Sequence, residues 1–426
     1  MKTLSLSSKK KDYLRHTSNS IPPFRGVISF ELLFALFLFA GLYKGDPRLA
    51  WVPVDLTAFF FGLSVISGLV ILLKRGIVIN RKAFILCVLY IAFAGYVLLT
   101  FIWTPGRIYS TQKVLYIWTL VLWAVAAPAL IISADPSRIK RLGTIFILLS
   151  IIISFEAISQ YIQAGQPGFI RVFGSNYLGL GRIAGLALIF LYAYLLFWAR
   201  SSLAKLLAVA SAGLFLWVLL VGGARGPFIA AALSALMPIL FAAHISLKRQ
   251  VIKVERFAVP IIIITIAVIA LLAFFYQTGQ MTQTMYRLQV LTSDGMGDSV
   301  EARMQHYVHA IEYWKQAPLL GNGIGSWPII NGDIDVRSYP HNLILEILVE
   351  LGLVGLILFS LPILYALTIL KPPPGYDQSI NILLLMLIIY MFLNSMVSGD
   401  IPDNRLLFAC IGLTPAALYF RGKKYG

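Results

Sequence analysis

The sequence predicts an all-α polytopic membrane protein with about 12 transmembrane helices and one large, partly helical loop on the outer side. Three observations predict this fold class. The 426 residues are 59% hydrophobic and only 12% charged, with a mean hydropathy of +0.83. Apolar runs of about 20 residues, each long enough to cross a bilayer as a helix, recur along the chain. The Lys and Arg residues lie mainly in short loops between these runs, which is the pattern that sets membrane orientation.

The composition argues against a soluble protein and against a nucleic-acid-binding protein. A soluble domain of this length needs far more charge to cover its surface. The net charge of +17 does not indicate nucleic acid, because the cations are spread over interhelical loops. Cys87 and Cys410 both lie in apolar runs, so we expect neither a disulfide framework nor a cysteine metal site.

The chain divides into four regions. Residues 1–26 form a basic segment expected to remain as a cytoplasmic tail, because the apolar run after it has no clear cleavage site. Residues 27–276 hold nine predicted spans, residues 277–342 the outer loop, and residues 343–426 three more spans with a short cytoplasmic C-terminus. The spans are expected at 27–43, 50–73, 83–103, 114–133, 142–163, 178–198, 203–221, 226–245, 257–276, 343–370, 379–397 and 405–420. The span 343–370 exceeds one bilayer thickness and should protrude.

The orientation follows from the loops that carry clustered cations, which are expected in the cytoplasm. Both termini then lie inside and residues 277–342 lie outside. Such a long loop usually carries function. The cation clusters are Lys74 to Lys82, Arg138 to Arg141, Arg200 with Lys205, Lys248 to Arg256, and Arg421 to Lys424.

Part of the outer loop should be helical, over residues 301–316. Apolar side chains recur there at helical spacing, and Asp298 followed by Glu301 resembles a capping box. We expect this helix to lie along the membrane surface or to pack on the bundle. The apolar stripe consists of Met304, Tyr307, Val308, Ile311 and Trp314, and the pattern ends at Pro318, Gly321, Gly323 and Gly325.

His341 is the candidate for acid–base chemistry. It follows Pro340 and precedes a long apolar run, which places it at a helix start on the outer surface. A histidine there can accept a proton near neutral pH; the alternative is an interfacial hydrogen bond. Glu346 and Glu350, within the next three turns, could orient the imidazole or bind sugar hydroxyls, or could simply stabilise the helix start.

Three arginines are candidates for binding a phosphate group, because the planar guanidinium grips phosphate oxygens in pairs. Arg225 lies in the tight connection Gly222 to Pro227, Arg303 lies on the loop helix, and Arg182 follows Gly181 at an outer helix end. The alternative for each arginine is that its side chain simply extends to the polar membrane surface. Asp400 and Asp403 lie in the last outer loop, where a solvated turn is the ordinary interpretation. His306 and His309 lack a clear third ligand, so neither a metal site nor another cofactor is expected.

Several of these fragments, in this order along a twelve-helix chain, resemble the O-antigen ligase and polymerase superfamily. The resemblance covers about the last half of the chain. The fragments are Gly222 to Pro227, Arg303 with Trp314, Pro318 with Gly321, Gly323 and Gly325, Pro340-His341-Asn342 with Glu346, and Glu350 to Gly355.

The resemblance implies a membrane-embedded, metal-independent glycosyltransferase that takes a glycan from undecaprenyl diphosphate. In the ligase branch the acceptor is the lipid A–core oligosaccharide of lipopolysaccharide, at the periplasmic face of the bacterial inner membrane, with inversion expected. The diphosphate-binding residues then correspond to Arg225 and Arg303, with Arg182 as a further candidate, and the catalytic residue to His341. Asn342, Glu346 and Asp400 are supporting or acceptor residues. Ala224 stands where the family often has Ser.

Three alternatives stay open on the sequence. An O-antigen polymerase or an O-linked oligosaccharyltransferase of the same superfamily would share the donor and differ in the acceptor. A transporter of lipid-linked glycan would perform no chemistry and should carry charged groups at the membrane midplane. Glu156 is the nearest candidate for such a group, and it lies toward the outer end of its span.

Overall fold

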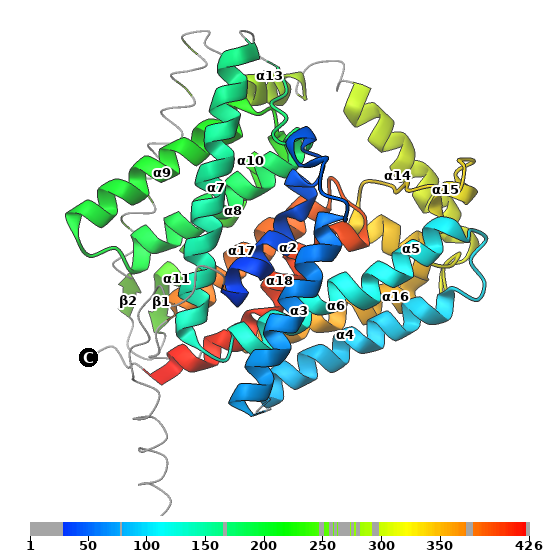
Figure 1. The fold of residues 1–426 in the computed structure, drawn as a ribbon, viewed down its shortest axis with the longest axis horizontal. Helices are drawn as coiled ribbons and strands as arrows, with labels where there is room; N and C mark the ends of the chain where they lie inside the picture. Colours follow the sequence, from blue (N-terminus) through cyan, green and yellow to red (C-terminus); the bar gives the residue numbers. More distant parts are fainter. Residues whose placement is uncertain are drawn as a thin grey trace, which may run out of the picture.

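A computed structural model gives the structure of the protein. It describes residues 29–76, 79–164, 168–246, 251–254, 282–291, 298–371 and 378–422, together with 259, 262, 273 and 277. These parts are almost entirely helical (Figure 1).

Seven helices in the described parts are long and apolar enough to cross a membrane. Two shorter apolar helices, α2 (Phe30–Tyr43) and α17 (Ser379–Ser395), accompany them. The helical class of the protein is therefore confirmed, while the twelve spans stay a prediction. The seven are α3 (Leu56–Arg75), α4 (Arg81–Thr100), a composite span Ile108–Ile132, α7 (Pro136–Ala164), α8 (Tyr177–Phe197), α9 (Ser202–Val221) and α16 (Leu343–Leu370).

The composite span changes helix type along its length. It consists of α5 (Ile108–Tyr116), the π-helix η2 (Ile117–Val121), α6 (Leu122–Ala127) and the π-helix η3 (Pro128–Ile132). Pi-helical turns are rare and are found often at functional sites. The polar residues of α5 described below lie directly before the first of them.

Two predicted spans differ from the structure, and a third cannot be compared. Residues 226–245 are not one helix, because Pro238 separates α10 (Arg225–Ala235) from α11 (Ile239–Ala242). Strand β1 (Ala243–Ser246) follows and pairs antiparallel with β2 (Val251–Val254). The predicted span 405–420 is α-helical only in α18 (Arg405–Gly412) and continues as the 3-10 helix η5 (Thr414–Gly422). The predicted span 257–276 lies almost wholly outside the described residues.

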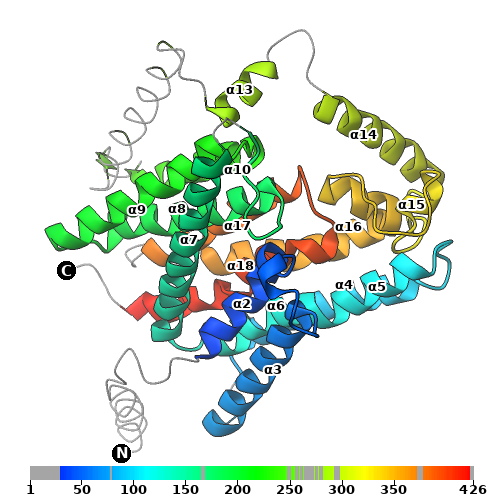
Figure 2. The same ribbon diagram turned by 45° about the horizontal axis from the view of Figure 1, so that its top comes forward.

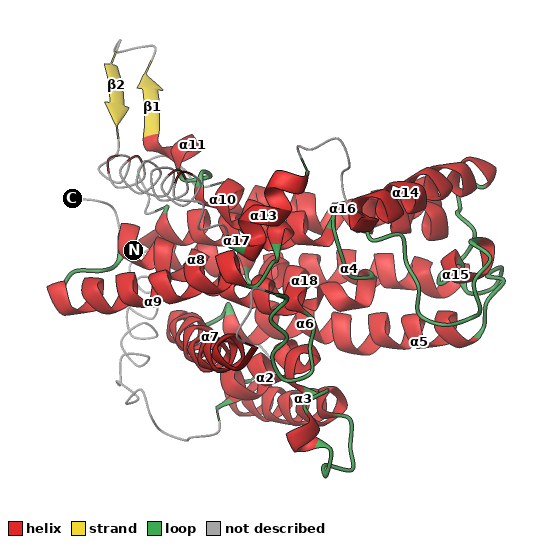
Figure 3. Ribbon diagram, turned by 90° about the horizontal axis from the view of Figure 1, so that it is seen from above, coloured by secondary structure: helices red, strands yellow, loops and turns green. Residues whose placement is uncertain are grey.

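The segment predicted to be an outer loop contains three helices, α13 (Gln283–Val290), α14 (Asp298–Gln316) and α15 (Trp327–Ile330). Helices α14 and α15 lie together at one end of the helix bundle, here called the α14 end, whereas α13 lies beside α9 and α10 (Figures 1 and 2). The strand pair lies at the opposite end (Figure 3). The predicted helix at 301–316 is confirmed, and Ala310 is buried on it while Met304, Val308 and Ile311 are exposed.

Helix α16 is interrupted at Gly352, which adopts φ 64° and ψ −164°. Residues 318–325, here called the glycine loop, lie against the break. A Cβ on Gly352 would lie 2.3 Å from the Leu319 carbonyl oxygen, and Gly321 has φ 72°, so only glycine fits at both positions. The loop thereby satisfies backbone groups that the break frees. The hydrogen bonds run from Asn322 N to Val349 O (2.9 Å), Gly323 N to Glu350 O (2.9 Å), Leu353 N to Pro318 O (3.0 Å) and Val354 N to Leu319 O (3.1 Å).

Candidate active site

His341 lies at the α14 end, two residues before the start of α16. Asn342 is the N-cap of α16, and its Oδ1 accepts hydrogen bonds from Ile344 N at 3.0 Å and Leu345 N at 3.1 Å. The predicted helix start is therefore confirmed. His341 itself has φ 60°, a backbone conformation that a non-glycine residue rarely adopts. Such strain is maintained where the surrounding structure fixes the residue.

Aromatic rings and one cation surround the imidazole of His341. The ring centroid lies 4.7 Å from that of Tyr339 and 5.9 Å from that of His306, both edge to face. Its Nδ1 is buried without a hydrogen-bond partner among the described residues. Burial, reinforced by the charge of Arg303, lowers the pKa of His341 to about 4. The imidazole is therefore neutral at physiological pH and able to accept a proton.

Arg225 and Arg287 join the connection between α9 and α10 to α13. Arg225 is buried, and its Nη1 donates to the Arg287 carbonyl at 3.1 Å, while Arg287 Nη1 donates to the Gly223 carbonyl at 2.6 Å. The Arg287 guanidinium also lies over the rings of Phe169 (5.0 Å) and Tyr177 (5.2 Å). Two cations are thus held in fixed positions beside the short turn at Gly223.

Arg303 connects this pair to His341. It lies on α14, and its positive charge acts on both Arg225 and His341. Arg287 also repels Arg225. We refer to Arg225, Arg287 and Arg303 as the arginine cluster. Concentrating three like charges is unfavourable in the empty protein, and a bound dianion or trianion would relieve the repulsion.

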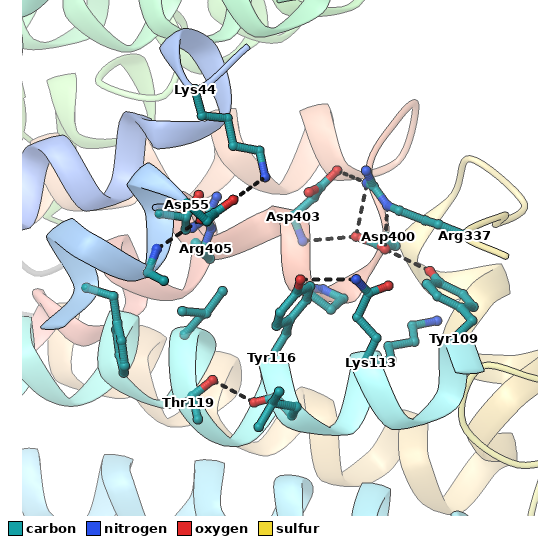
Figure 4. A pocket seen from close by; sticks show the side chains of 17 residues that line it. Lys44, Asp55, Tyr109, Lys113, Tyr116, Thr119, Arg337, Asp400, Asp403 and Arg405 are labelled. Carbon is teal, nitrogen blue, oxygen red and sulfur yellow. Dashed lines mark hydrogen bonds and ion pairs between the residues drawn. The ribbon is translucent and has the colours of Figure 1, made fainter. Parts of the chain in front are cut away.

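Asp400 lies on the other side of His341, in the loop before η4 (Ile401–Asn404). Tyr109 donates its hydroxyl hydrogen to Asp400 Oδ2 at 2.7 Å, and Arg337 Nε donates to the same oxygen at 3.0 Å (Figure 4). Arg337 also pairs with Asp403. Burial opposes the charge of Asp400, but Arg337 and Lys113 hold the pKa of this carboxyl below its ordinary value. Asp400 therefore belongs to a buried charge network instead of a solvated turn, while Asp403 is exposed.

Among the described residues, the ion-pair and hydrogen-bond partners of the Glu346 carboxylate are Lys113 and Ile401, and the supporting role of this residue stays a prediction. It is fully buried and forms an ion pair with Lys113, whose Nζ lies 2.5 Å from Glu346 Oε1 and 2.6 Å from Glu350 Oε2. Glu346 Oε1 also accepts the backbone N–H of Ile401 at 3.2 Å. Burial of an ammonium group favours pairing with carboxylates over sugar contact. The network thereby joins α5, α16 and the Asp400 loop.

Arg182 lies apart from the arginine cluster. Its Nη2 donates to the Ser398 carbonyl at 2.5 Å and to the Asn394 carbonyl at 3.4 Å. It lines a smaller cavity, of about 270 Å³, together with Arg337, Tyr339 and Asp403. The structure thus brings the charge of Arg303 to both Arg225 and His341, and directs the Arg182 side chain toward the loop that carries Ser398. Its binding of the diphosphate stays a prediction.

Two charged residues at this end were not identified from the sequence and help to build it. Arg287 follows the N-cap Thr282, whose side chain accepts from Met285 N, so a capping signal could have indicated its helix. Asp335 caps α5 from another part of the chain, accepting the N–H groups of Arg107 (2.7 Å), Ile108 (2.8 Å) and Tyr109 (3.1 Å). No local sequence pattern could predict that Asp335 caps α5, because the two lie over 200 residues apart in the chain.

No group of three His, Cys, Asp or Glu side chains suited to a metal ion occurs in the described parts of the chain. His309 Nδ1 lies 3.2 Å from Asn331 Oδ1, and His306 lies against Trp327 and His341. The two histidines therefore face different neighbours. The charged groups that could bind an anionic substrate are the arginines.

The comparison with known families agrees with this arrangement. The family model described as O-antigen ligase matches residues 187–360. This region is therefore similar to the O-antigen ligase family. It includes Arg225, Arg287, Arg303 and His341, so the arginine cluster and the imidazole lie within the family region, while Lys113 and Asp400 lie outside it. No curated protein matches the chain. Members of the O-antigen ligase superfamily are membrane glycosyltransferases, which supports an enzyme.

Proposed function

We propose that this protein transfers a glycan from undecaprenyl diphosphate to lipid A–core oligosaccharide in lipopolysaccharide biosynthesis. The reaction takes place at the periplasmic face of the bacterial inner membrane. The observation that carries the proposal is the position of neutral His341 beside the charge of Arg303, which in turn lies beside Arg225 and Arg287. A group that can bind an anion, the arginine cluster, thus lies next to a proton acceptor, the His341 imidazole.

The proposed chemistry is a single displacement. The acceptor hydroxyl oxygen bonds to the anomeric carbon as the bond from that carbon to the diphosphate oxygen breaks. The electron pair stays on the diphosphate, and the hydroxyl proton passes to the imidazole of His341, so the anomeric configuration inverts.

The arginine cluster stabilises the leaving group. Negative charge grows on the bridging oxygen as the bond breaks. Fixed guanidinium groups therefore bind the transition state more strongly than they bind the donor in its ground state. Because Arg225 and Arg287 are held by carbonyl groups and aromatic rings, little reorganisation is needed when the donor binds. Cationic side chains in this position make a divalent metal unnecessary.

The other acceptors remain alternatives within this chemistry. An O-antigen polymerase or an O-linked oligosaccharyltransferase would use the same donor site. A transporter is supported less well: Glu156, the nearest midplane candidate, has an exposed partner, Arg48 Nη2, at 3.2 Å.

The test is reconstitution of the purified protein with undecaprenyl-diphosphate glycan in the presence of chelator, with and without lipid A–core. A ligase attaches glycan to lipid A–core and releases lipid diphosphate only as acceptor is consumed. Lengthening of the lipid-linked glycan without lipid A–core would identify a polymerase. Transport of intact donor with no product in either reaction would overturn the enzyme proposal.

A further inference from the structure

A cavity of about 500 Å³ lies beside the Asp400 network and outside the arginine cluster (Figure 4). Helices α3 and α5, both parts of candidate membrane spans, form two of its walls. None of the three clustered arginines lines it. The cavity is therefore separate from the proposed diphosphate site.

The lining of the cavity changes from polar to apolar along the two helices. Asp55 and Gln112 lie near the starts of α3 and α5, whereas Phe61 and Leu120 lie farther along the two spans, and Asp55 lies across the cavity from Tyr109 (Figure 4). From Gln112 to Leu120 the chain rises about 12 Å. This gradient fits an amphipathic molecule whose polar part lies at the α14 end and whose apolar part enters the bilayer.

Helix α5 presents a polar stripe to the cavity. Tyr109, Gln112 and Tyr116 of α5 line it at spacings of three and four residues, which places them on one helix face, and Thr119 of η2 lines it beyond them. Gln112 is exposed, and its amide donates to the Tyr116 hydroxyl at 3.1 Å. Polar groups on a membrane span need polar partners. Within the protein, Tyr109 donates to Asp400 and Thr119 donates to the Leu115 carbonyl, and hydroxyl groups of a sugar can use the remaining lone pairs of these side chains.

Charges of both signs surround the polar end of the cavity. Lys44 pairs with Asp55 at 3.4 Å, and Arg405 lies near Asp55 and Asp403. Arg405 Nη1 is buried without a hydrogen-bond partner among the described residues, although its guanidinium lies 5.3 Å from the centre of the Phe37 ring. This balance differs from the arginine cluster and suits hydroxyl groups better than a diphosphate.

The cavity also lies within reach of His341. Arg337 lines it and stacks on Tyr339 at 5.3 Å, and Tyr339 contacts the His341 ring. Tyr339 and Arg337 therefore connect the imidazole to the cavity, while the charge of Arg303 connects it to the arginine cluster. A base between two substrates is the arrangement that a transfer between them requires.

We infer that this cavity binds the glycan head of a lipid-anchored acceptor, with its lipid chain along α3 and α5. The inference rests on the proposed function for the identity of the reaction. It assigns acceptor recognition to Gln112, Tyr116 and Thr119, and to the charged residues around Asp55.

A pair of adjacent substitutions tests the inference. Gln112→Trp fills the cavity, whereas Thr111→Trp adds the same bulk at an exposed neighbour that does not line it. With purified full-length protein, we expect Gln112→Trp to raise the KM for lipid A–core at least tenfold and to leave the KM for undecaprenyl-diphosphate glycan unchanged. Thr111→Trp should change neither. Binding of lipid A–core alone, measured by native mass spectrometry, should weaken to the same extent.

Several outcomes test whether the cavity binds the acceptor, and they can be distinguished from a failure of the proposed function. A raised donor KM in Gln112→Trp would assign the cavity to the donor, and equal behaviour of the two variants would remove it as a site. If the wild-type protein extends the lipid-linked glycan without lipid A–core, the ligase proposal is overturned but the cavity inference is not. The effect of Gln112→Trp is then measured on the KM for the lipid-linked glycan that acts as acceptor. Should Gln112→Trp not fold, the double variant Tyr116→Phe/Thr119→Val removes two hydroxyls without added bulk and should raise the same KM.

Discussion

The ammonium group of Lys113 lies 2.5 Å from Glu346 Oε1, and neither side chain is exposed to solvent. Glu350 completes the group at 2.6 Å. Two carboxylates share one buried ammonium group, so removing Lys113 leaves both carboxylates without a compensating charge.

Lys113→Met should therefore lower the free energy of unfolding by about 3–5 kcal/mol. Thermal unfolding of the purified protein in detergent measures the change. The triple variant Lys113→Met/Glu346→Gln/Glu350→Gln should recover most of the loss, because no buried charge remains. The control is Lys44→Met, which removes an ion pair with both partners about half exposed and should cost under about 1 kcal/mol. Equal losses in the two single variants would contradict this account.

The glycine loop predicts a difference between two glycines of positive φ. A Cβ on Gly323 (φ 94°) would lie 2.6 Å from Thr104 Cα, whereas Gly332 (φ 85°) has open space around it. Gly332→Ala reports backbone strain alone, about 1–2 kcal/mol. Gly323→Ala adds the clash and should be less stable than Gly332→Ala by a further 1–3 kcal/mol or so. Melting temperatures of the two variants make the comparison, and similar values would show that the loop can move away from α5.

His341 gives the enzyme a defined dependence on pH. Because its pKa is lowered to about 4, the neutral base predominates at every pH above that value. The kcat/KM of the free enzyme should therefore show no loss from this group until the pH falls toward 4. A bound diphosphate offsets the charge of Arg303, raises the pKa of His341 and moves the acidic limb of kcat to higher pH. If the acidic limbs of the kcat and kcat/KM profiles coincide, the diphosphate does not act on the pKa of His341. The variant His341→Ala should abolish transfer while the donor still binds.

Arg287 should contribute to donor binding although no sequence pattern indicated it. Arg287→Ala should reduce kcat/KM by about 100-fold, as expected for loss of one preorganised donor group. Arg287→Lys should be impaired as well, because an ammonium cannot reproduce the stacking on Phe169 and Tyr177. Arg107→Ala is the matched control, since Arg107 also lies over a ring, that of Phe101, at 5.5 Å. Unchanged donor kinetics in Arg287→Ala would remove it from the site.

The orientation of the chain is tested by labelling in intact cells. In a background without Cys87 and Cys410, Gly332→Cys should react with a membrane-impermeant thiol reagent, while Gln250→Cys should not. The cation clusters that place Gln250 inside and residues 277–342 outside are the reason. Reversed labelling would contradict both the orientation and a periplasmic reaction.

Local patterns predicted the parts of this protein that local physics determines. The 3.6-residue period predicted α14, and Pro340 predicted the start of the next helix, α16, because both signals are encoded within a few residues. The arginines of short glycine turns and loop helices were identified for the same reason. Arg303 lies close enough to His341 for its charge to act on the imidazole, while the roles of Arg225 and Arg303 stay predictions.

Pairing over long distances explains what sequence reasoning missed. Lys113 borders an apolar run, and nothing near it indicates that its partner Glu350 lies 237 residues later. Glu346 was interpreted from its own helix turn, whereas its partner comes from α5. The kink at Gly352 was also invisible, because a single glycine inside an apolar run does not reveal the loop that fills the break.

The same separation has a consequence during synthesis of the chain. The ribosome delivers Lys113 to the membrane while Glu346 and Glu350 are still untranslated, and at about 5–20 residues per second the interval is roughly 10–50 s. For that time the ammonium must extend to water or lipid head groups, which is feasible because Lys113 lies only five residues from the start of its span. The lysine can enter its buried position only after α16 has been inserted. Assembly of the proposed acceptor cavity is therefore a late, post-translational event that depends on the last third of the chain.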